Sequence, residues 1–173
     1  MEIVINKYSS FENELIMSTM VKDEDAYILQ WIDFHRQLGV SRFIIYDNSD
    51  MFTLGTLLDS YIRDKIVVLF RWSLKLTLYP PCGCTFAQQP AQQNHSLHIY
   101  KTSSYIGFMD VDEYVNIQGG SSDLRTLFDT TTRIHKIDLS ECSGFQLLNK
   151  FFLTHLACQH LGSISYTFLT VTH

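Results

Sequence analysis

Four short apolar runs divide the first two thirds of this sequence, and polar or charged residues follow each of them. The runs cover residues 15–20, 43–46, 66–70 and 105–109. Each has the length and composition of a buried strand, and the segments between them are long enough to hold helices. Parallel strands need such crossover connections. The pattern therefore predicts an α/β fold, with a mainly parallel sheet covered by helices on both faces.

Helical spacing supports the connections. Tyr27, Trp31, Phe34 and Leu38 recur at intervals of three and four residues, which predicts a helix with this apolar stripe facing the core. Further helices are expected over residues 53–63 and 86–101. Ser122 or Asp123 can cap a short helix that ends near Phe128.

Composition limits the class of protein. A length of 173 residues favours one domain over residues 1–173, and 46% hydrophobic residues supply material for its core. The net charge of −5 and the lack of a basic run argue against nucleic acid as a ligand. The apolar stretch Ile66–Phe70 is too short for a transmembrane segment, and the first ten residues carry no secretory signal. With four scattered cysteines, we expect a cytoplasmic protein.

Three of the four apolar runs end in acidic clusters. These clusters lie at residues 22–25, 47–50 and 110–113. In open parallel sheets, ligands bind in the crevice outside the carboxyl ends of the strands. The acidic side chains are therefore expected to surround one site.

Asp110 and Asp112 form the sharpest part of this pattern. Residues i and i+2 of an extended segment point to the same side, about 7 Å apart, so both carboxylates could face one divalent cation. Such a pair suits Mg²⁺ or Mn²⁺, which commonly bridge to substrate phosphates. The pair alone fits a solvated acidic turn equally well. Glu113 either adjoins the cation or caps the next turn.

Five segments in order resemble a known family. They are residues 20–24, 31–35, 45–49, 89–95 and 105–114. These segments are similar to motifs of the glycosyltransferase family 92 domain, a member of the GT-A glycosyltransferase superfamily. The family has an opening V-K-N-E, then E-W-I-x-x-H and Y-D-N-x-S, a Q-x-A helix and a D-x-D-E strand end. Order and spacing agree over roughly residues 17–130.

This resemblance implies a three-layer α/β/α fold of the GT-A type, which so short a chain could leave incomplete. It also implies a UDP- or GDP-sugar donor, a carbohydrate acceptor, and Mn²⁺ or Mg²⁺ as cofactor. By the same likeness, Asp110 and Asp112 bind the metal. The residues expected around the nucleotide sugar are Val21, Lys22, Asp23, Glu24, Asp47, Asn48, Asp110 and Val111.

Two alternatives to a working transferase remain. The donor-binding part spans about residues 14–130, and the remaining residues match the family poorly, so we expect a truncated transferase. Such a chain could be a remnant that binds a nucleotide or a partner without turnover. The other alternative is a metal-dependent phosphatase with Asp110 as nucleophile, because Asp-x-Asp also occurs in enzymes of the haloacid dehalogenase type. Those enzymes place the motif after their first strand, whereas here it follows the fourth. No residue can be named as the base that activates the acceptor.

Overall fold

A six-stranded mixed sheet forms the centre of the computed structural model, which describes residues 11–73, 88–117, 123–137, 144–148 and 166–171. The strand order is β3-β2-β1-β4-β6-β5. The first four strands in this order pair in parallel, whereas β6 pairs antiparallel with both β4 and β5. The strands are β1 Leu15–Val21, β2 Arg42–Asp47, β3 Val67–Arg71, β4 Tyr105–Phe108, β5 Gly144–Leu148 and β6 Tyr166–Val171. The prediction of an α/β fold with a mainly parallel sheet is confirmed.

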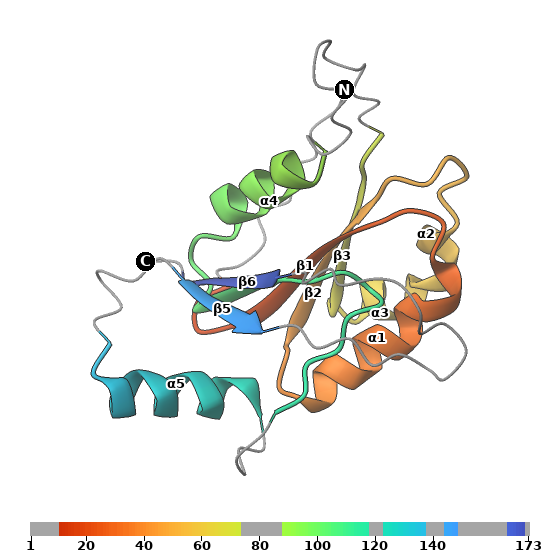
Figure 1. Ribbon diagram of the computed structural model, residues 1–173. Coiled ribbons are helices and arrows are strands. Elements are labelled where there is room, and N and C mark those ends of the chain that lie inside the picture. The colour runs from red at the N-terminus through yellow and green to blue at the C-terminus, as the bar shows by residue number, and fades with distance from the viewer. Residues whose placement is uncertain (1–10, 74–87, 118–122, 138–143, 149–165, 172–173) are drawn as a thin grey trace, which may run out of the picture.

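Helices cover both faces of the sheet, which gives three layers (Figure 1). The helices are α1 Asp25–Gln37, α2 Leu54–Leu57, α3 Asp59–Arg63, α4 Gln88–Ile99 and α5 Leu124–His135. One apolar cluster joins the sheet to α1, α2 and α5, and includes Trp31, Phe43 and Phe128. A second cluster on the opposite face contains Ile44 and Ile106, and Leu97 of α4 packs against it. Alternate residues of the four parallel strands thus contribute to two separate cores.

The buried face of α1 differs from the predicted stripe. Tyr27 is 58% exposed, so its assignment to the core was wrong. The helix instead buries Ile28, Trp31, Ile32 and His35. His35 belongs to this face because its Nδ1 donates to the backbone carbonyl of Trp31 over 2.9 Å, which satisfies one polar atom of the ring inside the core.

Two other helices were predicted with the wrong extent. The helix expected over residues 53–63 is divided into α2 and α3 at Leu58, whose backbone has φ −98° and ψ 9°. Gly55 lies within α2, where glycine weakens helix formation. Asp123 caps α5 as expected, by accepting from the backbone N–H of Thr126, but the helix continues past Phe128. Within this extension, the hydroxyl of Thr132 donates to the carbonyl of Phe128 one turn earlier, so its polar group is satisfied inside the helix.

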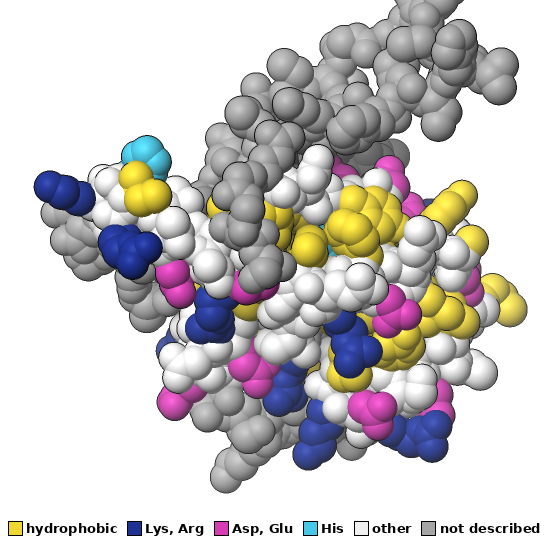
Figure 2. Space-filling view, turned by 90° about the horizontal axis from the view of Figure 1, so that it is seen from below, with side chains coloured by type: hydrophobic (Ala, Val, Ile, Leu, Met, Phe, Trp, Pro, Cys, Tyr) yellow, Lys and Arg dark blue, Asp and Glu magenta, His cyan; other side chains and the backbone are white. Residues whose placement is uncertain are grey.

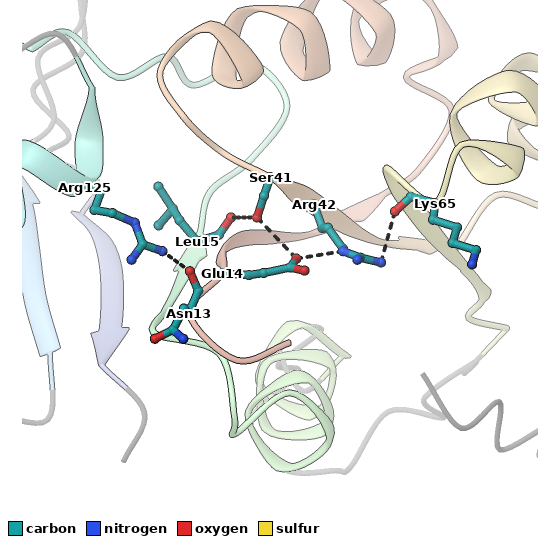
Figure 3. A network of polar contacts seen from close by, with 7 residues as sticks. All are labelled: Asn13, Glu14, Leu15, Ser41, Arg42, Lys65 and Arg125. Atoms are coloured by element: carbon teal, nitrogen blue, oxygen red, sulfur yellow. Dashed lines mark hydrogen bonds and ion pairs between the residues drawn. The ribbon is translucent and has the colours of Figure 1, made fainter. Parts of the chain in front are cut away.

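The amino edge of the sheet is closed by a polar network around Glu14 and Arg42 (Figure 3). Arg42 Nε donates to Glu14 Oε2 over 2.7 Å, and its guanidinium also lies over the ring of Phe11. Ser41 donates to Glu14 and to the carbonyl of Leu15. These contacts join the starts of β1 and β2 at the edge opposite the acidic clusters.

The surface seen from below in Figure 2 carries Lys and Arg side chains interspersed with Asp and Glu, so neither sign of charge dominates this face. Within the described part of the chain, no helix has the length and apolar character needed to cross a membrane.

Candidate functional site

The carboxyl ends of β1, β2 and β4 meet at one edge of the sheet. Since β1 lies between the other two strands and pairs in parallel with both, the loops that follow the three strands are neighbours. The register places Val21 beside Asp47, and Asn48 donates its backbone N–H to the carbonyl of Val21 over 2.8 Å. The predicted site residues therefore come together from segments far apart in the sequence.

A tight turn presents Asp110 and Asp112. Glu113 donates its backbone N–H to the carbonyl of Asp110 over 3.1 Å, and its carboxylate accepts the N–H of Asp110 over 3.2 Å. Trp31 Nε1 donates to the carbonyl of Glu113, which ties the turn to α1. Glu113 therefore holds the turn formed by residues 110–113, and its predicted place beside a cation stays a prediction; Asp110 and Asp112 are exposed at the surface.

The charges of Asp110 and Asp112 act on the carboxylate of Glu24, which comes from a different loop. The pKa of Glu24 is raised by burial, and then by the charges of Asp112 and Asp110. Although Asp110 is exposed as a residue, partial desolvation of its carboxyl group raises the pKa, as do the charges of Glu113 and Asp112. Negative charge contributed by both β1 and β4 thus accumulates at this edge. A cation placed there would relieve the repulsion.

The carboxylates at this edge suit an ion such as Mg²⁺, which keeps several water ligands, and do not form a site in which protein side chains supply all the ligands. Within the described ranges, no three His, Cys, Asp or Glu side chains are grouped so that they could hold a metal ion by themselves. Mg²⁺ is usually bound through one or two carboxylates together with water and substrate phosphates. Asp110 and Asp112 could supply these carboxylates, with Glu24 contributing further negative charge.

The loops after β1 and β2 are joined by a chain of hydrogen bonds. Asp47 is fully buried, and its Oδ1 accepts the backbone N–H of Ser49 over 2.9 Å. The hydroxyl of Ser49 accepts the N–H of Asp23, whose backbone is left-handed with φ 57°. Asp47 therefore fixes the position of Asp23, and nucleotide contact by its buried carboxylate stays a prediction.

The remaining predicted residues differ in what they can offer a ligand. Val21 and Val111 are buried at 0% and 1% exposure, so their side chains belong to the core. Lys22 is exposed at the surface of the loop, and Asn48 is half-buried beside it. A nucleotide at this edge would thus meet Lys22 and Asn48 through side chains, and the two valines through the backbone.

Sequence analysis did not identify the part played by α4. Gln89 Nε2 donates to Asp110 Oδ1 over 3.1 Å, and Gln88 Oε1 accepts from Asn48 Nδ2 over 3.4 Å. In the sequence, Gln89 stands out only as the first residue of the segment 89–95 that resembles the family's helix motif. A glutamine before a proline carries no local signal for a contact with a carboxylate 21 residues away.

A separate cavity lies beside β3, the edge strand of the described sheet. Its volume is about 290 Å³, and its lining includes Phe52, Gly55 and Ile62. None of the predicted site residues borders it, and its surface is mostly apolar. The carboxylate cluster is therefore the better candidate for a site that handles a charged substrate.

Comparison with known proteins assigns the chain to a family. The family model described as Glycosyltransferase family 92 matches residues 16–144, well over half of the chain. The chain belongs to glycosyltransferase family 92. Its four parallel strands and flanking helices are consistent with the GT-A-like fold expected from the resemblance.

Family 92 relatives from plants match at low identity. A family 92 protein of Ricinus communis is 25% identical over 108 residues, which cover 62% of this chain and 18% of the relative. A relative from Oryza sativa subsp. japonica is 22% identical over 112 residues, which cover 64% of this chain and 17% of the relative. A relative from Arabidopsis thaliana is 28% identical over 111 residues, which cover 62% of this chain and 17% of the relative. The chain thus spans less than a fifth of the length of these curated relatives.

Proposed function

We propose that this family 92 chain binds a nucleotide sugar at the carboxyl edge of β1, β2 and β4, and transfers the sugar to a carbohydrate acceptor. The observation that supports the proposal is the group of three carboxylates, Glu24, Asp110 and Asp112, at the end of a parallel sheet, where the charges of both aspartates raise the pKa of Glu24 and the charge of Asp112 raises the pKa of Asp110. Family membership supports transfer of a sugar as the reaction class.

The negative edge makes a bare diphosphate a poor ligand, so a cation has to accompany the donor. Mn²⁺ or Mg²⁺, bound by Asp110 and Asp112, would neutralise the charge that develops on the leaving diphosphate. The turn held by Glu113 keeps the two carboxylates in place before the donor arrives. Lys22 adds a positive side chain at the opposite loop, suited to a phosphate or a ribose hydroxyl.

Calorimetry with UDP-sugars and GDP-sugars in the presence of Mn²⁺ tests the proposal. The double substitution Asp110→Ala with Asp112→Ala should weaken Mn²⁺-dependent binding by about 100-fold or more, since both carboxylate ligands are lost. Asp64→Ala is the matched control, because Asp64 is an exposed aspartate at the end of α3, in the connection that leads to the amino end of β3. The control should bind as the unchanged protein does.

Three kinds of result would count against this assignment. If no nucleotide sugar binds, or if the double variant binds as tightly as the control, the site is misplaced. If donor binds but neither transfer nor donor hydrolysis follows, the chain is a nucleotide-binding module and not a working transferase. If the protein hydrolyses simple phosphate esters and Asp110→Ala abolishes this activity, the result would instead support the phosphatase alternative.

A further inference from the structure

Helix α4 reaches both sides of the candidate site with consecutive residues. Gln88 pairs with Asn48 at the end of β2, and Gln89 donates to Asp110 just beyond the end of β4. Because β1 lies between β2 and β4, the first turn of α4 contacts the loops on either side of the central strand. Among the described residues, no side chain of another helix hydrogen-bonds to Asp110 or Asp112.

Beneath this turn, a buried polar chain fastens α4 to the sheet. Gln92 Nε2 donates to Ser18 Oγ over 2.5 Å, Ser18 Oγ and Ser96 Oγ are 2.7 Å apart, and Ser96 Oγ donates to Tyr46 Oη over 2.9 Å. Tyr46 Oη in turn lies 2.8 Å from His95 Nδ1. The chain thus alternates between α4 and strands β1 and β2.

The hydrogen bonds of this chain run in one direction. The single hydroxyl proton of Ser96 is given to Tyr46, so Ser18 must donate to Ser96, and Tyr46 is left to donate to His95 Nδ1. Every member then has a partner, and Gln92 and Ser96 are buried at 1% and 0% exposure.

Polar anchoring of this kind restricts how α4 can sit. An apolar face tolerates small shifts along a sheet, whereas a displaced buried hydrogen bond leaves donors and acceptors unpaired. The face that α4 buries is formed by Gln92 and Ser96. The helix therefore has one favoured position, which delivers Gln89 to a fixed point beside Asp110.

Asp110 needs such a partner. Like charges on Glu113 and Asp112 act on its carboxylate and would drive the side chain away from Asp112. The amide of Gln89 donates to Oδ1 of Asp110 and favours the charged form of the carboxylate. Oδ2 of Asp110 forms no hydrogen bond with any described residue. The contact holds one oxygen and leaves the other for a ligand.

We propose that Gln89 is a positioning residue, which fixes the carboxylate of Asp110 for cation binding from a helix anchored through Ser18, Gln92, Ser96, Tyr46 and His95. The inference rests on the proposed function, because it assigns Asp110 the role of a metal ligand. Gln89 itself contacts neither cation nor substrate.

Direct Mn²⁺ binding, measured by calorimetry and by water-proton relaxation without nucleotide, tests Gln89→Leu. Loss of a partner that orients a ligand lowers metal affinity, here by about 10-fold. Gln93→Leu is the matched control, with the same substitution on the same helix, because the side chain of Gln93 forms no hydrogen bond within the described part of the chain. The control should bind Mn²⁺ as the unchanged protein does, and both variants should keep its urea midpoint.

The combined variant separates positioning from a general effect on structure. If Gln89 acts through Asp110, then Gln89→Leu together with Asp110→Ala binds Mn²⁺ no more weakly than Asp110→Ala alone. A full 10-fold further loss in the combined variant overturns the inference, as does unchanged Mn²⁺ affinity in Gln89→Leu while Asp110→Ala loses binding. If Asp110→Ala itself binds Mn²⁺ normally, the proposed metal site fails, and the role of Gln89 fails with it.

Discussion

Protonation of His35 should destabilise the fold at mildly acidic pH. The side chain is fully buried, and its ring lies against Trp31, Phe34 and Tyr114. Nδ1 carries the proton that is donated to the carbonyl of Trp31, and Nε2 is buried with no hydrogen-bond partner among the described residues. A second proton on Nε2 would place a charge where no acceptor exists. Burial accordingly lowers the pKa of His35 from 6.5 to about 4, although the bond to Trp31 opposes the shift.

The sign and size of the effect follow from this pKa. Between pH 6.5 and about pH 4 the unfolded chain binds a proton at His35 that the folded chain does not, so stability rises with pH in this window and falls on acidification. With 1.36 kcal/mol for each pKa unit, the full loss is about 3 kcal/mol, of which about 2 kcal/mol is lost between pH 7 and pH 5. This is a large share of the stability of a typical domain.

Urea unfolding followed by tryptophan fluorescence from pH 5 to pH 7 measures this loss. His35→Asn keeps a donor near the position of Nδ1 but removes the titrating ring, so it should be less stable at pH 7 and show a flatter dependence on pH. His135→Asn is the control, since His135 is exposed at the end of α5. Carboxylates that titrate in the same range cancel when a variant is compared with the unchanged protein.

The deciding quantity is how steeply the stability of each variant changes between pH 5 and pH 7. If His35→Asn loses as much stability between pH 7 and pH 5 as the unchanged protein and the His135 control, the imidazole does not remain neutral inside the fold. The reasoning from burial would then be wrong, whatever the absolute stability of the variant.

Three smaller predictions concern stability, each measured by urea unfolding. Ser96→Ala should cost about 2 kcal/mol, because it leaves the buried hydroxyl of Tyr46 without the donor that serves it; a cost below about 0.5 kcal/mol would mean that the polar chain is not formed. Arg42→Met should cost about 1 kcal/mol through loss of the half-buried pair with Glu14, and the loss should shrink when Glu14 is already replaced by Gln. Asp123→Ala should cost about 1 kcal/mol and reduce the helical circular dichroism signal, since α5 loses its N-cap; an unchanged signal would contradict that role.

The sequence predicts the four parallel strands and the edge of the site because both depend on local signals. Each parallel strand is a short apolar run that stops at charged residues, and the carboxyl ends of such strands must share one edge. The sequence alone therefore places Asp110 and Asp112 at the same edge of the sheet as Glu24. The metal and the nucleotide that they are expected to hold stay predictions.

Other features depend on contacts that leave no local trace. His35 reads as a polar residue at a helix end, yet a neutral imidazole with one satisfied nitrogen packs as an aromatic ring. The pairing of Ser18 with Ser96 joins residues 78 positions apart, and neither serine is unusual in its own segment. The role of Gln89 depends on that pairing, so the sequence could not indicate it.

The central position of β1 also determines when the site can form during folding. β1 pairs with β2 across a short connection, such as Ile16 with Arg42, but it pairs with β4 through residues as distant as Leu15 and Tyr105. Closing the longer loop costs about 1 kcal/mol more in chain entropy, so β1 and β2 are expected to pair first. Glu24 is then in place while Asp110 and Asp112 are still on an unattached segment. A partly folded chain that has joined only β1 and β2 therefore has no complete carboxylate cluster, and Mn²⁺ should slow unfolding without speeding the first stage of folding.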